Sequence, residues 1–554
     1  MKRELPIGID NYRELKEKNY YVVDKSNLIK DFLSNGIKVT LITRPRRFGK
    51  TINLSMLAEF LDMRKESKKL FEDTDIMETT YMTELNQHPV IFLSFKECKG
   101  SKQNLVKNMK LEIAREFERY KDVLKREDMN RLEQSLYDFL MPRLYDCMDE
   151  DVFGLDDTLS FLMQRIYNVS GKTVYLILDE YDTPFIESHI HGYYSEVKDT
   201  FSSMLSKSLK GNPYLNKAMM TGIQRIAKEN TPPAGFSLFS GLNNLFVCTV
   251  KDEEYAKYFG FTTEETKHLL KDYDLTLNEH VKAMYDGYQF GSIEIYNPWS
   301  IINYASTKRL EAYWVNTSEN KMIRSSIRKR GLGFSIYFQN LIENGYVDAY
   351  TKLQSSFYEE EADESLWGLF VNAGYLKIER VLRGDEMRLK IPNEEVRMEF
   401  KSIVSAFLEV GENDIITMLN ALLQGKLSEF EMFYRQMLLK LPSSFDLQRE
   451  NSYHMMMLGM CAFLYEDYEV LSNREAGNGR SDICLKARRA NQLHVLMEFK
   501  YTKDKNQNLK ELAEIALKQI DDKNYAAELS LPVLKIGLAH RGKDLELAAC
   551  LCES

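Results

Sequence analysis

The 554-residue sequence lacks features that several classes of protein require. It holds 27 glycines and 12 prolines, too few for a collagen-like chain or one dominated by linkers. Its seven cysteines are odd in number and include no CxxC pair, which argues against a disulfide framework or a zinc cage. No run approaches the ~18 apolar residues of a membrane span, and the first residues contain no apolar signal-peptide core. We therefore expect a cytoplasmic protein without a membrane partner.

The composition is close to that of an average globular protein. Hydrophobic residues make up 44% and charged residues 28%, so disorder is excluded as the main state. The net charge of −9 indicates that the surface as a whole does not attract nucleic acid, although it leaves room for a local basic groove.

Short apolar runs alternate with helical stretches in the first 250 residues. Runs of this kind are typical of strands buried on both faces, and their alternation with helices predicts a parallel sheet with crossover helices. The expected strands are 38–43, 90–95, 174–179, 217–223 and 245–250. We expect an α/β domain over 1–250, a mainly helical region over 251–400, and a helical lead-in with a second α/β domain over 401–554.

The last part of the chain predicts a helix, a strand, a turn, a strand, a helix and a strand. The expected elements are a helix over 451–465, strands over 481–487 and 492–501, a helix over 510–520 and a strand over 532–538.

Residues 44–51, RPRRFGKT, follow the first expected strand and precede a helical stretch. This context is the one required of a phosphate-binding loop, GxxxxGK[ST], with Arg44 in place of the first glycine. Lys50 would reach the β and γ phosphate oxygens, and the Thr51 hydroxyl would bind Mg²⁺. The loop residues assigned to nucleotide binding are Arg46, Arg47, Phe48, Gly49, Lys50 and Thr51. The alternative is a basic turn that caps a surface helix.

A second element supports nucleotide binding. The apolar run 174–180, VYLILDE, ends in two acids. Asp179 would hold Mg²⁺, and Glu180 would orient and activate the attacking water. Two acids after an apolar strand can also simply end it, but both elements in this order favour ATP binding.

Hydrolysis also needs an arginine that stabilises charge, for which Arg46, Arg47 and Arg225 are candidates. Thr221 and Gln224 end the fourth expected strand, where a polar sensor of the γ-phosphate often lies. Polar capping of the strand is the alternative for these two residues.

A second group of charged residues lies near the end of the chain. Asp482 begins one expected strand, and Glu498 and Lys500 lie two residues apart on the next, so both point to one face. A hairpin would bring that face beside Asp482. The two carboxylates would then hold Mg²⁺ or Mn²⁺, while Lys500 steadies charge on a phosphodiester. Glu475 could add a carboxylate, and Gln519 could orient the water or the lysine.

The surroundings of this group are basic. Residues 479–510 hold eight lysines and arginines against three acids, although the whole chain is acidic. A basic island around a metal site suits a polyanionic substrate. A solvated basic hairpin with salt-bridged strands is the alternative.

With these motifs in place, the sequence resembles bacterial and archaeal AAA-ATPase-like proteins that end in a PD-(D/E)XK nuclease-superfamily domain. The resemblance runs nearly end to end. It rests on LPIGIDNY (5–12), YYVVDKSNLI (20–29), RPRRFGKT, LILDEYDTP (176–184), TGIQRIAKEN (221–230), FSGLNN (239–244), YDGYQF (285–290), YNPWS (296–300), WVNTSEN (314–320), GRSD (479–482), EFK (498–500) and ALKQIDDKNY (516–525).

The resemblance implies a P-loop ATPase module with a parallel sheet and flanking helices. It also implies a restriction-endonuclease-like α/β domain with its metal site at Asp482, Glu498 and Lys500. In the expected last strand, 537–546, His540 stands where the family leads us to expect an aromatic residue. TPPAG (231–235) is expected to be a mobile loop.

Three functions remain open at this point. The first is an ATP-gated, metal-dependent nuclease, with DNA favoured over RNA as substrate. The second is a nucleotide-dependent switch whose last domain binds nucleic acid without cutting it. The third is a ring-forming remodeller, against which the sequence shows no clear trans-acting arginine motif and no substrate-threading loop. The oligomeric state is left open.

Overall fold

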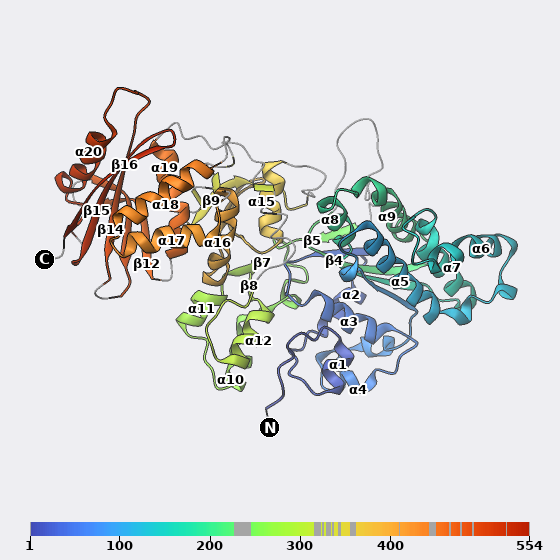
Figure 1. The fold of residues 1–554 in the computed structure, drawn as a ribbon. Coiled ribbons are helices and arrows are strands. Elements are labelled where there is room, and N and C mark those ends of the chain that lie inside the picture. Colours follow the sequence, from blue (N-terminus) through green and yellow to red (C-terminus); the bar gives the residue numbers. More distant parts are fainter. Residues whose placement is uncertain are drawn as a thin grey trace. The chain divides into compact units, whose positions relative to one another are not determined.

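The structure is a computed structural model, and it forms two compact units (Figure 1). One unit comprises Met1–Trp314 and Tyr350–Met387, and the other comprises Val315–Ala349 and Arg388–Ser554. The described residues are 2–225, 245–314, 323, 326–327, 334, 337–338, 340–341, 345–354, 362–408, 410–441, 450–464, 467–476, 479–489, 492–527 and 529–552. The three-part division at residues 250 and 400 stays a prediction.

A five-stranded parallel sheet forms the centre of the N-terminal unit, as the sequence predicts. Its order is β2-β3-β4-β1-β5, with every neighbouring pair parallel. The strands are β1 (Val39–Thr43), β2 (Val90–Ser94), β3 (Val174–Asp179), β4 (Leu215–Gly222) and β5 (Leu245–Cys248), each within two residues of its expected bounds. Because all strands run the same way, their carboxyl ends meet at one edge, where ligands of open α/β sheets bind.

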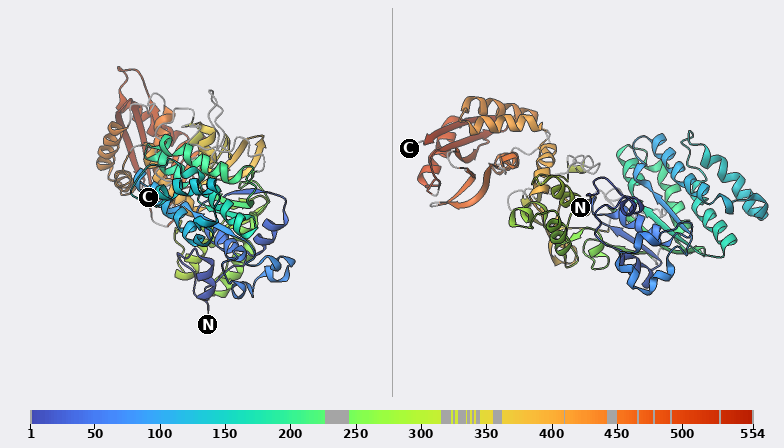
Figure 2. Two further views of the ribbon diagram at one scale, coloured as in Figure 1. Left: turned by 90° about the vertical axis from the view of Figure 1, so that its right-hand side faces the viewer. Right: turned by 90° about the horizontal axis from the view of Figure 1, so that it is seen from below.

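Helices cover both faces of this sheet, and every residue of β1 and β3 is buried (Figure 2). The helices of this part are α1 (Tyr12–Glu17), α2 (Asn27–Ser34), α3 (Lys50–Leu61), α4 (Lys68–Phe71), α5 (Lys102–Arg119), α6 (Arg131–Tyr145), α7 (Thr158–Ser170), α8 (Thr183–Ile190) and α9 (Tyr194–Leu209). One hydrophobic core joins α5, α6, α7 and α9 to the sheet, so these helices position its strands.

The expected helical region holds more strand than the sequence indicates. Its helices are α10 (Thr263–Asp272), α11 (Glu279–Tyr285), α12 (Pro298–Thr307) and α15 (Asp363–Asn372). Its strands are β6 (Phe261–Thr262), β7 (Tyr288–Phe290), β8 (Ile293–Tyr296), β9 (Tyr346–Tyr350), β10 (Lys377–Arg383) and β11 (Glu386–Lys390). They form two three-stranded sheets, β6-β8-β7 and β10-β11-β9. Several of these strands are too short for their alternation to stand out.

The C-terminal unit is a helical lead-in followed by a five-stranded sheet. The helices are α16 (Glu394–Leu408), α17 (Glu412–Leu423), α18 (Leu427–Lys440), α19 (Glu450–Cys461) and α20 (Leu509–Asp522). The strands are β12 (Tyr468–Ala476), β13 (Gly479–Ala487), β14 (His494–Tyr501), β15 (Val533–Arg541) and β16 (Asp544–Cys552). They pair in chain order, and only β14 and β15 are parallel, with α20 as their crossover.

Two strands of this sheet were not predicted. The sequence indicates neither β12 nor β16, and residues 537–546 are not one strand but two, joined by a tight turn. Gly542, with φ +59°, takes the left-handed conformation that this turn needs. Gly537 has another role: a Cβ there would lie 2.2 Å from the Ala513 carbonyl oxygen, so glycine lets α20 pack closely on β15.

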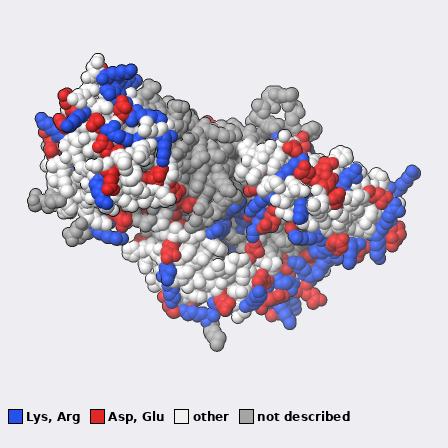
Figure 3. Space-filling model, viewed as in Figure 1, with Lys and Arg blue, Asp and Glu red and all other residues white. Residues whose placement is uncertain are grey.

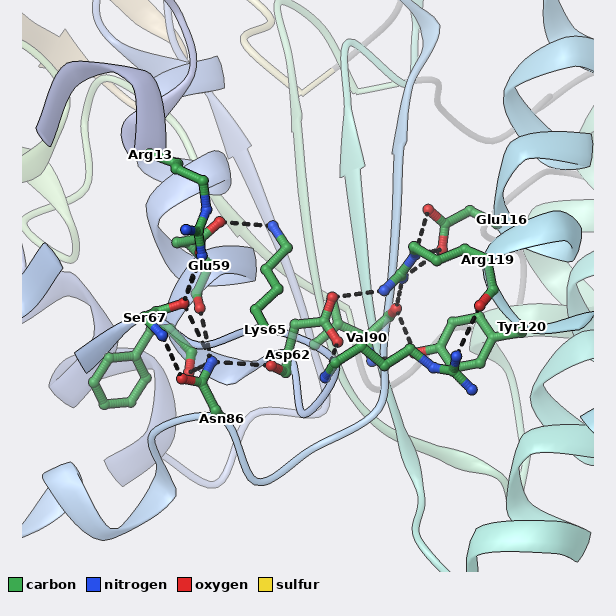
Figure 4. A network of polar contacts seen from close by, with 12 residues as sticks. Arg13, Glu59, Asp62, Lys65, Ser67, Asn86, Val90, Glu116, Arg119 and Tyr120 are labelled. Carbon is green, nitrogen blue, oxygen red and sulfur yellow. Dashed lines mark hydrogen bonds and ion pairs between the residues drawn. The ribbon is translucent and has the colours of Figure 1, made fainter. Parts of the chain in front are cut away.

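A network of polar contacts connects α1, α3 and α5 beside Val90, the first residue of β2 (Figure 4). The Glu59 carboxylate accepts from Lys65 at 2.7 Å and Ser67 at 2.6 Å, and also pairs with Arg13. These contacts outweigh burial and lower the pKa of Glu59. On the other side, Arg119 Nη1 donates to Asp62 at 2.6 Å, and its Nε donates to Glu116 at 3.2 Å.

Arg119→Ala should destabilise the N-terminal unit by about 3 kcal/mol, because it leaves the buried Asp62 and Glu116 carboxylates without their cation. Thermal unfolding followed by tryptophan fluorescence measures this, since all three tryptophans lie in this unit. Arg115→Ala on the same helix removes only an exposed pair with Glu112 and should change stability by less than about 0.5 kcal/mol. Equal effects of the two changes would contradict the role of the network.

Candidate nucleotide site and candidate metal centre

The phosphate loop lies between β1 and α3, as the sequence predicts. Gly49 has φ +81° and directly precedes Lys50, the first residue of α3. Glycine takes this conformation without strain, and it aims the N–H groups of the helix start at the carboxyl edge of the sheet. The loop therefore has the backbone shape that an anion site requires.

Lys50 is buried and folds back onto this loop. Its ammonium donates to the carbonyl oxygens of Arg44 at 2.8 Å and Pro45 at 2.9 Å. Burial lowers its pKa. An ammonium has three N–H donors, so a phosphate oxygen would either accept from the third or replace one of these carbonyls.

Asp179 brings the expected metal ligands together at the carboxyl edge. One of its oxygens accepts from the Thr51 hydroxyl at 2.7 Å, and the other accepts from Thr221 at 2.7 Å. Ser94, at the end of β2, donates at 3.3 Å. Burial, followed by the charge of Glu180, raises the pKa of Asp179. A cation would offset that cost, so the hydroxyl and carboxylate found here fit Mg²⁺.

The two acids after Asp179 have different surroundings. Glu180 has φ +48°, a strained value for a residue with a side chain, and its carboxylate accepts from Thr183 at 3.1 Å. Asp182 is buried and accepts from the backbone N–H groups of Ile223 at 2.7 Å and Gln224 at 2.9 Å. Burial raises the pKa of Asp182 to about 6. Asp182 thus fixes the end of β4 beside the end of β3.

The loop side chains are held by the protein itself. Arg44 is fully buried, donates to the carbonyls of Thr43 and Cys248 at 3.0 Å, and lies 4.8 Å from the Phe290 ring centre. Burial lowers its pKa to about 10. Phe48 packs between Tyr288 and Phe290, so only its backbone can face a nucleotide. This explains why arginine is compatible with the first position of the motif.

For two of the remaining candidate arginines, the hydrogen-bond partners lie in the N-terminal unit. Arg47 donates to the Tyr313 carbonyl, and Arg225 donates to the Gln354 side chain, each at 3.0 Å. Arg46 lies in the phosphate loop with its side chain half-buried. Their assignment to nucleotide binding stays a prediction.

The charged residues of the C-terminal unit converge on the paired strands β13 and β14. Ile483 pairs with Met497, so Asp482 on β13 lies beside Glu498 on β14. The Asp482 carboxylate accepts from the Phe499 N–H at 2.8 Å. The Lys500 ammonium lies 3.5 Å from Glu498 Oε1. The hairpin thus unites the three residues that the sequence indicates.

Glu498 is a buried carboxylate with one oxygen left without a hydrogen bond among the described residues. Its carboxylate is 2% exposed, and Oε2 has no hydrogen-bond donor among the described residues. Burial, together with the charge of Asp482, raises its pKa to about 7. An unsatisfied carboxylate oxygen beside a second carboxylate fits a divalent cation, and Asp482 and Glu498 are the residues that would hold it. Within the described part of the chain, no third acid, histidine or cysteine joins them in a ready-made cluster.

Two neighbours complete this site. Gln519 on α20 donates to Glu498 Oε1 and so orients the carboxylate, whereas the sequence suggested water or the lysine as its target. Glu450, at the start of α19, lies 3.6 Å from the Lys500 ammonium. No sequence pattern pointed to Glu450, because it lies outside the motif and before the first strand of the sheet. The side chain of Glu475 lies outside the described residues.

Comparison with known proteins agrees with the two expected domains. Residues 6–231 match the family model described as a predicted AAA-ATPase, and residues 448–548 match the PD-(D/E)XK nuclease superfamily. The chain carries an AAA-ATPase-like domain and a C-terminal PD-(D/E)XK nuclease-superfamily domain. A protein of Azotobacter chroococcum mcd 1, "Uncharacterized protein in vnfD 5'region", is 26% identical over 409 residues, covering 72% of this chain and 69% of that protein.

Some expected features remain untested in this two-domain chain. TPPAG at 231–235, FSGLNN at 239–244 and residues 315–320 lie outside the described residues. In the described part, no helix is both long and apolar enough to cross a membrane.

His540 packs against aromatic side chains in the nuclease-superfamily domain. Its ring stacks on Tyr453 with centroids 3.9 Å apart, and its Nε2 is 3.0 Å from the Tyr434 hydroxyl. Burial lowers its pKa to about 3, so the imidazole is neutral when folded. It therefore packs in the core beside β14 rather than taking part in the metal centre.

The buried His540 should make this domain less stable in acid. The unfolded chain binds a proton near pH 6.5, but the folded domain does not until about pH 3, so stability falls as the pH drops through this range. Between pH 7 and pH 5, wild type should lose about 2 kcal/mol more than His540→Phe. Hydrogen exchange of β14 and β15 peptides, compared between the two proteins at each pH, measures the difference. The same loss in both proteins would contradict a neutral buried His540.

Proposed function

We propose that the chain is an ATP-binding ATPase whose C-terminal domain hydrolyses phosphodiester bonds in nucleic acid with a divalent metal, and that ATP regulates this cleavage. The observation that carries the nuclease assignment is the buried, unsatisfied Oε2 of Glu498 beside Asp482 and Lys500. A carboxylate in this state costs stability unless something completes its coordination.

At the C-terminal site, Asp482 and Glu498 would hold Mg²⁺ or Mn²⁺. When bound, such an ion lowers the pKa of water and balances phosphodiester charge. The Lys500 ammonium, held between Glu498 and Glu450, is placed to stabilise charge that develops on the phosphate. Water adds to phosphorus as the bond to the leaving oxygen breaks, which yields a phosphate monoester and a hydroxyl group. Gln519 keeps Glu498 in position throughout.

At the N-terminal site, Lys50 would bind the phosphates of ATP, and Thr51 and Asp179 would hold the accompanying Mg²⁺. Glu180 would orient the attacking water, and Thr221, bonded to Asp179, would sense the γ-phosphate. Support comes from the hydrogen bonds that already gather Thr51, Asp179 and Thr221 at one edge.

The proposed substrate follows from the local charge. Basic and acidic side chains are interspersed over the face seen in Figure 3. The chain as a whole has a net charge of −9. The excess of basic residues over 479–510 is therefore a local feature of the segment that also holds the candidate metal ligands. This supports a nucleic-acid substrate, and DNA is the first one to test.

Glu498→Gln should reduce cleavage on the order of 100-fold or more, because an amide oxygen replaces a charged ligand while the side-chain shape is kept. The measurement is cleavage of labelled DNA and RNA with Mg²⁺ or Mn²⁺, and chelation by EDTA should abolish it. Glu546→Gln, which changes a half-exposed glutamate of the same sheet, is the matched control and should cleave like wild type. Metal-dependent cleavage that survives in Glu498→Gln would disprove the site.

Lys50→Ala should weaken ATP binding by about 10- to 100-fold, since a charge-assisted hydrogen bond contributes about 1.5–3 kcal/mol. Isothermal titration calorimetry measures the affinity, and Lys69→Ala, an exposed lysine of α4, is the control. If ATP regulates cleavage, adding ATP should change the wild-type rate and leave the Lys50→Ala rate unchanged. ATP turnover without cleavage of any substrate would favour the nucleotide-dependent switch.

A further inference from the structure

The phosphate loop is held by residues that come much later in the N-terminal unit. Arg47 lies over Trp299, with Cζ 4.4 Å from the ring centre, and its Nη1 donates to the Tyr313 carbonyl at 3.0 Å. The Trp299 indole donates to the same carbonyl at 2.9 Å. One carbonyl oxygen therefore accepts from both members of a stacked pair, which fixes Arg47 relative to Tyr313.

Tyr313 stands where the chain leaves this unit, because Trp314 is the last residue of the first segment and Val315 belongs to the other unit. The chain re-enters at Tyr350, and four residues later the Gln354 side chain accepts from Arg225 at 3.0 Å. The chain crosses between the units three times, after Trp314, Ala349 and Met387. The first two crossings each lie near a hydrogen bond, within the N-terminal unit, from Arg47 or Arg225.

Arg225 is tied to the acidic end of β3 through the residue before it. The Gln224 N–H donates to Asp182 at 2.9 Å, and its carbonyl accepts from the Tyr181 hydroxyl at 2.7 Å. Tyr181 N–H in turn donates to the Thr221 carbonyl at 3.1 Å. The segment that leads to Arg225 therefore cannot shift independently of the residues beside Asp179.

We propose that Arg47 and Arg225 couple occupancy of the nucleotide site to the first two of the three chain crossings, and through them to the unit that holds the nuclease-superfamily domain. The proposal rests on the ATP binding proposed above. It offers a physical explanation for the regulation of cleavage. Each arginine contacts a segment through which the chain passes from one unit to the other, so a change at the arginine would shift the conformation of that segment.

Lys50 and Arg47 belong to the same short loop, so we expect a conformational change at Lys50 to alter the position of Arg47. A phosphate at Lys50 would draw on an ammonium that already donates to the carbonyls of Arg44 and Pro45, so its binding changes the balance of these loop contacts. Pro45 cannot move freely, because a Cβ on Gly374, at φ +88°, would lie only 2.9 Å from the Pro45 Cβ. Because one side of the loop is packed this tightly, we expect a change at Lys50 to be taken up at Arg47, which has φ +67°.

Trp299 provides a direct reporter of the Arg47 contact. The full-length double variant Trp314→Phe and Trp367→Phe leaves Trp299 as the only tryptophan of the chain. Saturating ATP with Mg²⁺ should change its emission, and Lys50→Ala should abolish the change. Arg47→Ala should also abolish it at equal occupancy, with bound ATP measured by equilibrium dialysis. Arg143→Ala is the matched control, since Arg143 likewise lies over an aromatic ring and donates to a carbonyl, both of Phe139.

Hydrogen exchange tests the second crossing and does not depend on the double variant folding. Peptides covering 345–354 of the otherwise unchanged chain should alter their exchange when ATP binds, and Arg225→Ala should remove that response. ATP binding by wild type without either response would overturn the coupling and leave the proposed ATP site standing. Unchanged responses in Arg47→Ala and Arg225→Ala would overturn the roles of these residues. Failure of wild type to bind ATP would overturn both proposals together.

Discussion

The N-terminal unit is organised around one buried carboxylate, Asp179. Its two oxygens accept from Thr51 on α3 and Thr221 on β4, so a single side chain joins the ends of two strands to the start of a helix. The strand order β2-β3-β4-β1-β5 makes this geometry possible, because it sets β3 next to β4 and β4 next to β1. Burial of a carboxylate without a nearby positive charge reduces the stability of the fold. This arrangement therefore keeps an unfavourable negative charge at the place where a cation and phosphates would be bound.

Glu498 is also a buried carboxylate, but its hydrogen bonding is different. Both oxygens of Asp179 have protein donors, whereas among the described residues only Oε1 of Glu498 has one. The two sites also draw their residues from different places. At Asp179 they come from three strand ends and a helix start spread over residues 51–221, and at Glu498 they come from one hairpin and the helix after it. The first site therefore depends on correct assembly of the whole parallel sheet, while the second depends mainly on the register of β13 and β14.

The sequence predicted what depends on local pattern and short spacing. Gly49, Lys50 and Thr51 form one motif between a strand and a helix, and Glu498 and Lys500 are two residues apart on one strand, so both groups could be recognised. Glu450 and the partners of Arg47 could not, because those contacts join residues far apart in the chain and have no periodic signature. β12 was missed for a related reason: it is an edge strand, and its sequence, YEVLSNREA, has no continuous apolar run. β16, the other edge strand, ends in the apolar run LAACLC, which was not recognised as a strand.

The replacement of the first glycine of the phosphate loop by Arg44 has a structural basis. The shape of the loop is set by packing: Arg44 lies against Phe290, Phe48 against Tyr288, and Arg47 against Trp299. All three aromatic partners belong to the region between the parallel sheet and the end of the first segment. The loop therefore keeps its conformation only while that region stays folded against it, which makes the region part of the nucleotide site as well as a connection to the rest of the chain.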